Sequence, residues 1–397
     1  MQLNVLTIMG LTVIIAVIGH SLFYKTGIPE SIFMILLGLT LGPLTGVIDA
    51  SNLSSIIAHI FTLSIIIILL ESGLTTDMNE AFATMRTTTF FTFTVLIVTS
   101  LLCGGFLYVT QGWSIYASII LGIICSGTST LPILYYTSRM RLNPAVNQML
   151  IFESVINDVT IITAVSLIIQ TINLELNPSK TIFSIAQYLL VATILGVIFS
   201  TIWTLVLAKI REELSLPYLT TLAISIILYA ITEVAGGSGV ISVMVFGVTM
   251  GNLPEHFRKR LSIRRKVSRF FTQIELMQDE VTFLVKNTFF FVLGLMFNPQ
   301  TITTRILIIA LVLTGLMIVS RWISYKTIGR LDKRYIHNTQ IVSLMVSRGL
   351  TAGLTAFMPT QQGIEIPPIT DIVIVMILFT NLAAILGFMI YNRSRKT

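Results

Sequence analysis

Apolar stretches long enough to cross a lipid bilayer follow one another along almost the whole chain. A helix of about 20 apolar residues crosses roughly 30 Å of hydrocarbon, and inside a bilayer only helices and closed barrels satisfy every backbone polar group. We therefore expect an all-α polytopic membrane protein with 13 transmembrane helices. The expected spans are residues 3–24, 29–46, 54–74, 87–110, 113–136, 145–172, 181–209, 214–234, 238–252, 268–297, 303–324, 338–359 and 367–391.

Composition agrees with this class, because 54% of the 397 residues are hydrophobic and only 11% are charged, against about 25% charged in soluble domains. We interpret the net charge of +7 as a signal of topology, because Lys and Arg collect in cytoplasmic loops. Connections after odd-numbered spans carry most basic residues, including a run from Arg321 to Arg334, whereas those after even-numbered spans carry only Lys180 and Arg305. We expect the amino terminus outside, the carboxyl terminus in the cytoplasm, and no nucleic-acid partner.

Cysteines and histidines give no sign of a metal or catalytic centre. Cys103 and Cys125 both lie in apolar runs, and the four histidines are scattered at the ends of spans. These spacings do not match structural metal sites. We expect buried cysteines, no cofactor, and a protein that is not an enzyme.

Segments seven spans apart resemble each other. Residues 38–44, Gly-Leu-Thr-Leu-Gly-Pro-Leu, match residues 247–253, Gly-Val-Thr-Met-Gly-Asn-Leu, and Leu70–Leu74 matches Val292–Leu295. We therefore predict two six-helix repeats, 1–172 and 214–397, joined by a linker helix at 181–209. Because the offset is odd, the repeats would be inverted, as in many secondary transporters. The alternative is that these glycines serve only helix packing.

Two spans in equivalent positions contain residues that interrupt helices. Ser126–Pro132 reads Ser-Gly-Thr-Ser-Thr-Leu-Pro, and Ser347–Gly353 reads Ser-Arg-Gly-Leu-Thr-Ala-Gly. We expect discontinuous helices that cross at mid-membrane, with freed carbonyls and half-helix ends lining a cavity. The alternative is a kinked helix whose Ser and Thr hydroxyls bond to the preceding turn.

Residues Phe152–Asp158, Phe-Glu-Ser-Val-Ile-Asn-Asp, place two carboxylates inside the apolar span 145–172. A charge at that depth costs on the order of 3 kcal/mol and marks a pathway or a paired site. Residues four apart share a helix face, so Glu153 aligns with Asn157 and Ser154 with Asp158. The two carboxylates therefore need different partners. A buried arginine requires a carboxylate, and we expect Glu153 to form a structural ion pair with Arg348 across two helices.

Together these motifs resemble the NhaP-type cation:proton antiporters, the branch related to sodium/proton exchangers. The matching segments are Leu70–Leu74, Thr130–Pro132, Phe152–Asp158, Glu233 with Ser238–Val240, Lys286–Gly294 and Arg348–Leu350. The resemblance covers nearly the whole chain. It implies exchange of a monovalent cation for H⁺ by alternating access. A core of spans 3–6 and 10–13 would move against a scaffold of spans 1–2 and 7–9, which forms a homodimer in a prokaryotic plasma membrane.

The resemblance also assigns roles to residues. Asp158 is expected to hold either the cation or the proton, because antiport needs one carboxylate that binds both. Ser154 and Thr130 supply oxygen ligands, which suit hard cations. The resemblance adds Glu71 as a further carboxylate ligand. For neutral Asn157, direct ligation and an interhelical hydrogen bond are both open, and Asn before Asp goes with electroneutral exchange in the family.

One position departs from the family. Most relatives have an aspartate between the Thr and Pro of the motif at 130–132, where this chain has Leu131. A shifted match over Gly127–Ser129 is the alternative and makes Thr128 and Ser129 candidate modulators of the site. Lys286 is either a charge near the site or a side chain that snorkels or pairs with Asp279 or Glu280.

Na⁺ is the expected cation, with Li⁺ or K⁺ as alternatives and pH homeostasis as the expected role. A potassium/proton antiporter of the same fold and a sodium-coupled symporter of a small organic solute are the competing functions. A symporter should show a larger polar cavity than these few side chains suggest. An intramembrane protease would need a second aspartate or a histidine at suitable depth, and the sequence offers neither.

Overall fold

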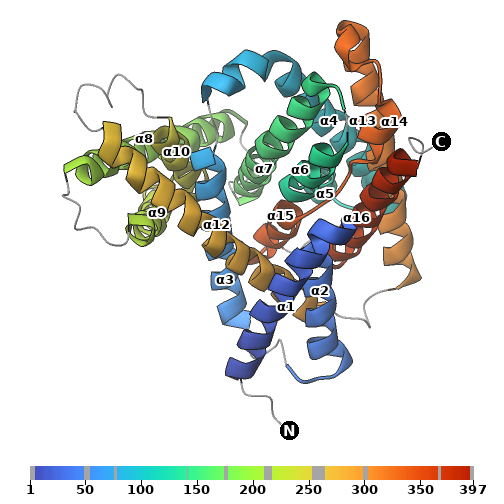
Figure 1. Cartoon of the computed structure of the whole chain (residues 1–397), viewed down its shortest axis with the longest axis horizontal. Helices are drawn as coiled ribbons and strands as arrows, with labels where there is room; N and C mark the ends of the chain where they lie inside the picture. Colours follow the sequence, from blue (N-terminus) through green and yellow to red (C-terminus); the bar gives the residue numbers. More distant parts are fainter. Residues whose placement is uncertain are drawn as a thin grey trace. The chain divides into compact units, whose positions relative to one another are not determined.

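The computed structural model describes residues 5–48, 54–75, 78–140, 142–173, 178–209, 217–252, 264–297, 303–364 and 368–393. All regular elements within these ranges are helices (Figure 1). In chain order they are α1 (Val5–Thr26), α2 (Glu30–Leu39), η1 (Thr40–Leu44), α3 (Ser54–Thr75), α4 (Met78–Gln111), α5 (Ile115–Ile124), α6 (Thr130–Arg139), α7 (Pro144–Asn173), α8 (Pro178–Lys209), α9 (Pro217–Val234), α10 (Gly239–Gly251), α12 (Arg264–Leu295), α13 (Thr304–Leu331), η3 (Lys333–Tyr335), α14 (Thr339–Leu344), α15 (Leu350–Gln361) and α16 (Ile369–Arg393).

The helices confirm the predicted class of a multi-pass membrane protein. Among the described residues, six helices are long and apolar enough to cross a bilayer: Thr87–Gln111, Pro144–Ile172, Ala186–Leu207, Pro217–Val234, Thr304–Leu331 and Ile369–Tyr391. The count of 13 crossings stays a prediction. So does the orientation, since some of its basic residues, at 258–260 and 395–396, lie outside the described ranges.

The chain divides into two compact units. Unit 1 comprises Met1–Ala58, Ala83–Ile168 and Asn287–Thr397, and unit 2 comprises His59–Phe82 and Ile169–Lys286. Each predicted repeat contributes residues to both units. The boundaries of the units therefore differ from those of the repeats. The two repeats, with their linker at 181–209, stay a prediction.

Both predicted helix interruptions are present and they touch each other. The first separates α5 from α6 at residues 125–129, and the second separates α14 from α15 at residues 345–349, so that each span is drawn as two helices in Figure 1. The backbone N–H of Ser129 donates to the carbonyl of Ser347 at 2.8 Å. The two interrupted segments therefore cross in direct contact inside unit 1, which confirms the expected discontinuous helices.

The glycines of the matched segments lie where helix backbones approach each other. In unit 1, a Cβ at Gly38 of α2 would collide with the backbone of α12 at Phe291, and one at Gly294 would collide with Ile35 of α2. In unit 2, a Cβ at Gly247 of α10 would lie 2.9 Å from the carbonyl oxygen of Leu70 on α3. Small residues permit such close crossings in membranes, so these glycines do serve packing.

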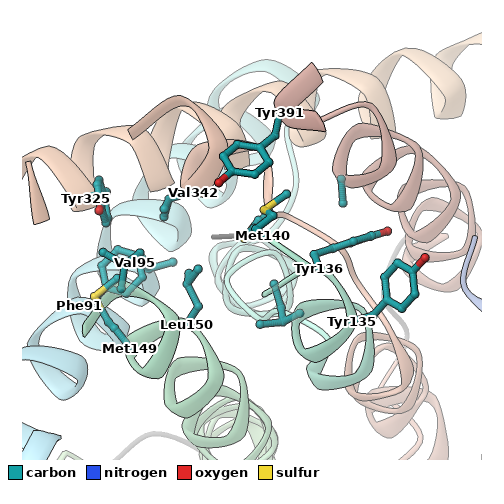
Figure 2. Close-up of a cluster of buried hydrophobic side chains, with 14 of the residues drawn as sticks. Phe91, Val95, Tyr135, Tyr136, Met140, Met149, Leu150, Tyr325, Val342 and Tyr391 are labelled. Carbon is teal, nitrogen blue, oxygen red and sulfur yellow. The ribbon is translucent and has the colours of Figure 1, made fainter. Parts of the chain in front are cut away.

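A hydrophobic cluster in unit 1 holds the helices that carry the interrupted segments. Figure 2 shows Phe91 of α4, Tyr136 of α6, Leu150 of α7, Tyr325 of α13 and Tyr391 of α16 among its side chains, all of them buried. The ring of Tyr325 meets that of Phe91 edge-on, with centroids 6.2 Å apart. Five helices of unit 1 are thus joined by apolar packing, and two of them, α6 and α7, carry polar groups described next.

Candidate functional site

Asp158 of α7 receives hydrogen bonds from two threonines at the starts of two helices. The hydroxyl of Thr351 donates to Oδ1 at 2.6 Å, and that of Thr130 to Oδ2 at 3.5 Å. Thr130 is the first residue of α6 and Thr351 the second of α15. Helix N-termini carry unsatisfied N–H groups and partial positive charge, so they favour a carboxylate there. The crossing of the two interrupted segments therefore holds the carboxyl group of Asp158, which is half-buried, at the point where α6 and α15 begin.

A buried arginine, Arg348, lies at the carboxyl-terminal ends of α5 and α14, the helices that precede the two interruptions. Its Nη2 donates to the carbonyl of Cys125, the residue that caps the end of α5, and its Nη1 donates to the carbonyl of Val346 at 3.2 Å. Helix C-termini carry partial negative charge, which a guanidinium neutralises. Arg348 thus stabilises freed carbonyls of both interruptions.

The partner of Glu153 is Arg321, and the predicted pair with Arg348 is wrong. Arg321 of α13 donates from Nη1 to Oε1 at 2.6 Å and from Nη2 to Oε2 at 2.9 Å, with both side chains fully buried. Its Nε donates to the carbonyl of Val342. The guanidinium of Arg348 is already bound to carbonyls, so the arginine that can meet Glu153 bidentately is the one on α13.

Arg321 was missed for a specific reason. The expected span 303–324 placed it at a helix end, among the basic residues of a connection. In the structure α13 continues to Leu331, so Arg321 lies inside the helix, with Phe91 under its guanidinium at 5.5 Å. The available signal was an arginine directly after the apolar run 306–320, since a charge at membrane depth needs a partner.

Asn157 and Thr128 belong to the same polar network as Glu153. The Asn157 amide donates to Glu153 Oε1 at 2.9 Å and to the hydroxyl of Thr128 at 3.3 Å. The Thr128 hydroxyl in turn donates to Glu153 Oε1 at 3.4 Å. These contacts favour the interhelical hydrogen bond for Asn157. Its Oδ1 has no hydrogen-bond partner among the described residues.

Ser154 and Ser129 are next to residues of this network in the sequence, and each donates a hydrogen bond to a backbone carbonyl. The Ser154 hydroxyl is buried and donates to the carbonyl of Ile151 in its own helix at 2.8 Å, which leaves its oxygen lone pairs for a ligand. Ser129 contributes the backbone bond of the crossing. Leu131, on the helix that starts at Thr130, is 40% exposed.

Two polar residues of α16 satisfy the backbone of the second interruption. The amide of Asn381 donates to the carbonyl of Arg348 at 2.9 Å, and its Oδ1 bonds the Ser347 hydroxyl. The Thr380 hydroxyl accepts from the N–H of Arg348 at 3.2 Å. Unsatisfied backbone groups are costly in a membrane, so this pair makes the interruption tolerable. The adjacent Thr and Asn in the apolar span 367–391 were the signal that sequence reasoning overlooked.

Glu71 and Lys286 lie in unit 2. Glu71 of α3 is half-buried and bonds the side chain of Thr282 on α12, with Lys286 and Asp279 as charged neighbours. On the same face of α12, Gln278 donates to the carbonyl of Ile67 on α3 at 3.2 Å. Lys286 is thus a charge near Glu71, and the expected part of Glu71 and Lys286 in the ion site stays a prediction.

Comparisons with known proteins agree with the expected family. A family model described as the transmembrane part of sodium/hydrogen exchangers matches residues 10–390. The sodium proton antiporter MjNhaP1 of Methanocaldococcus jannaschii at pH 8 is similar in structure, with a TM-score of 0.76, 18% identity, and coverage of 97% of this chain and 95% of that one. An electron-microscopy structure of the same antiporter gives a TM-score of 0.69 at 19% identity, covering 98% and 96%. The chain shares this antiporter fold, and it belongs to the sodium/hydrogen exchanger family.

Proposed function

We propose that this protein is an electroneutral antiporter that exchanges one monovalent cation, Na⁺ first, for one H⁺, with Asp158 binding either ion in competition. The observation that carries the proposal is the carboxylate of Asp158, held at the N-termini of α6 and α15 by the hydroxyls of Thr130 and Thr351. A carboxylate in that position can be neutralised by a cation or by a proton. Competition for one group links the two fluxes.

The surrounding groups suit a hard monovalent cation. Carboxylate and hydroxyl oxygens are the ligands that such ions prefer, and Asp158, Thr130 and the lone pairs of Ser154 offer them. The family resemblance adds Glu71 as a further candidate ligand. This donor set carries little negative charge, which favours a singly charged ion.

Charge accounting supports one-for-one exchange. Glu153 is neutralised by Arg321, Asn157 is uncharged, and Arg348 is bound to carbonyls. Asp158 is then the carboxylate of the crossing whose charge is free to change. Replacement of one proton by one monovalent cation leaves the net charge of the crossing unchanged.

The remaining parts of the proposal follow from the family. We propose alternating access in which the helices of the crossing move against a scaffold, assembly as a homodimer, and insertion in a prokaryotic plasma membrane with the amino terminus outside and no cofactor. Chemical crosslinking of the purified protein tests the dimer, and labelling from either side of cysteines introduced near the termini tests the orientation.

Transport into proteoliposomes that contain a pH-sensitive dye tests the function. External Na⁺ should move protons out of the vesicles, Asp158→Asn should abolish the signal, and a potassium ionophore that clamps the voltage should leave the rate unchanged. A response to K⁺ alone would make the protein a potassium/proton antiporter. If Na⁺, Li⁺ and K⁺ all fail, or if Asp158→Asn exchanges at the wild-type rate, the proposal is wrong.

A further inference from the structure

The two threonines on Asp158 are not equivalent. The Thr351 bond, at 2.6 Å, falls in the range of strong hydroxyl-to-carboxylate bonds. The Thr130 bond, at 3.5 Å, lies beyond the usual limit for such bonds. One hydroxyl therefore dominates the hydrogen bonding that Asp158 receives from the two half-helices. It comes from the second interrupted span, far from α7 in sequence.

The position of Thr351 in α15 leaves its hydroxyl available. Threonines inside helices usually donate to the carbonyl four residues earlier, as Thr355 does to the carbonyl of Thr351 at 2.6 Å. For Thr351 that carbonyl belongs to Ser347, which lies outside the helix and accepts from Ser129. The interruption before α15 thus directs the hydroxyl of Thr351, a residue only 8% exposed, onto the carboxylate.

We propose that Thr351 is a positioning residue that sets the competition between cation and proton at Asp158. A hydroxyl has one proton. While it donates that proton to Asp158, it stabilises the ionised carboxylate, which is the form that accepts a cation. Thr351 therefore favours cation over proton binding at a given pH. The inference rests on the proposed exchange function and adds to it a residue of α15.

Several other charged and titratable groups on the helices around the crossing are bonded to groups other than Asp158. On the described parts of α5, α6, α7, α15 and α16 they are, besides Asp158 itself, Tyr116, Tyr135, Tyr136, Arg139, Glu153, Asp371, Tyr391 and Arg393. Glu153 is paired with Arg321. Tyr136 and Arg139 donate to backbone carbonyls at Gly27 and Tyr24, and Arg348 donates to carbonyls of the crossing. The neutral Thr351 hydroxyl is thus a direct regulator of Asp158 that can be removed without changing any charge.

The test is the pH dependence of exchange in proteoliposomes for Thr351→Val, which keeps the shape and removes the donor. Loss of a hydrogen bond to a charged group changes an equilibrium constant, here that for proton binding to Asp158, by about tenfold or more. We expect the acid limb of the pH profile to move about one unit toward alkaline pH, and the apparent KM for Na⁺ to rise about tenfold at acid pH. At alkaline pH, where protons no longer compete, the KM difference should shrink.

Two controls separate this role from packing. Thr351→Ser keeps the hydroxyl and should restore the wild-type profile, whereas Thr351→Ala should behave like Thr351→Val. The Ser and Ala variants differ only by the hydroxyl, so their comparison is decisive even if valine is not accommodated. Thr355→Val, on the same helix but with its donor spent on its own backbone, should leave the profile unchanged.

The inference is overturned if Thr351→Val and Thr351→Ala keep the wild-type profile, if Thr351→Ser is shifted as far as Thr351→Ala, or if the variants lower kcat equally at every pH. Each of these outcomes, obtained with an active wild type and an inactive Asp158→Asn, leaves the antiport function standing. A wild type without cation-driven proton movement would instead refute the proposed function.

Discussion

The ion pair between Glu153 and Arg321 should be the most costly polar contact to break in unit 1. Both side chains are fully buried, and the guanidinium meets the carboxylate at 2.6 and 2.9 Å. Removing one partner of a buried pair leaves an uncompensated charge and costs about 3–5 kcal/mol. We therefore expect Glu153→Gln and Arg321→Met each to lower the free energy of unfolding by that amount.

The double variant distinguishes an ion pair from two independent contributions. With Glu153→Gln and Arg321→Met combined, no charge of the pair remains, and the amide oxygen introduced by Glu153→Gln still accepts from Asn157. We expect the double variant to lose less stability than either single variant, because replacing both charges by neutral groups is often nearly neutral. The assay is thermal unfolding of the purified protein in mild detergent, followed by tryptophan fluorescence.

Asp332→Asn serves as a matched control, since the pair of Asp332 and Arg334 is exposed to solvent and surface pairs contribute little. The fraction of Glu153→Gln protein that remains folded should keep a wild-type KM for Na⁺, because we expect Glu153 to stabilise the crossing without binding the ion. Additive losses in the double variant, or unchanged stability in both single variants, would refute the reasoning.

Three further predictions concern one contact of the crossing and two packing contacts elsewhere in unit 1. Asn381→Leu should destabilise the protein and slow exchange, because the carbonyl of Arg348 loses its donor; an unchanged unfolding midpoint would contradict this. Gly294→Ala should prevent correct folding, since a Cβ there meets the backbone of α2, whereas Gly105→Ala, with open space around it, should express normally; size-exclusion profiles of both variants decide. Tyr136→Phe should cost about 1 kcal/mol of unfolding free energy through loss of its bond to Gly27, and wild-type stability would show that this bond contributes nothing.

Local features of the fold were predictable from the sequence. The interruptions near Ser126 and Ser347 depend on glycine, proline and hydroxyl residues inside an apolar run, and such signals are contained in the segment itself. The candidate role of Asp158 was predictable for the same reason, because a carboxylate in an apolar helix is conspicuous. The structure places Thr130 beside Asp158, and the role of both residues in ion binding stays a prediction.

Partners between distant segments were harder to predict. Arg321 and Arg348 both satisfy the requirement for a buried cation, and the choice between them depends on the register of α13 against α7, which no local pattern encodes. Thr351 lies within the motif Ser347–Gly353, but no local pattern shows that its hydroxyl reaches Asp158. That hydroxyl becomes available only because α15 starts at Leu350. Polar groups of α16 were missed because an isolated Thr and Asn in an apolar helix also fit ordinary helix packing.

Proton release on cation binding tests most directly whether Asp158 alternates between a cation and a proton. Purified protein in weakly buffered detergent solution, at a pH on the acid limb of its exchange profile, should release close to one proton per chain when Na⁺ is added. Choline should release none, and Asp158→Asn should release none with Na⁺, although it remains folded. Release of protons by folded Asp158→Asn, or binding of Na⁺ by the wild type without any release, would contradict the account.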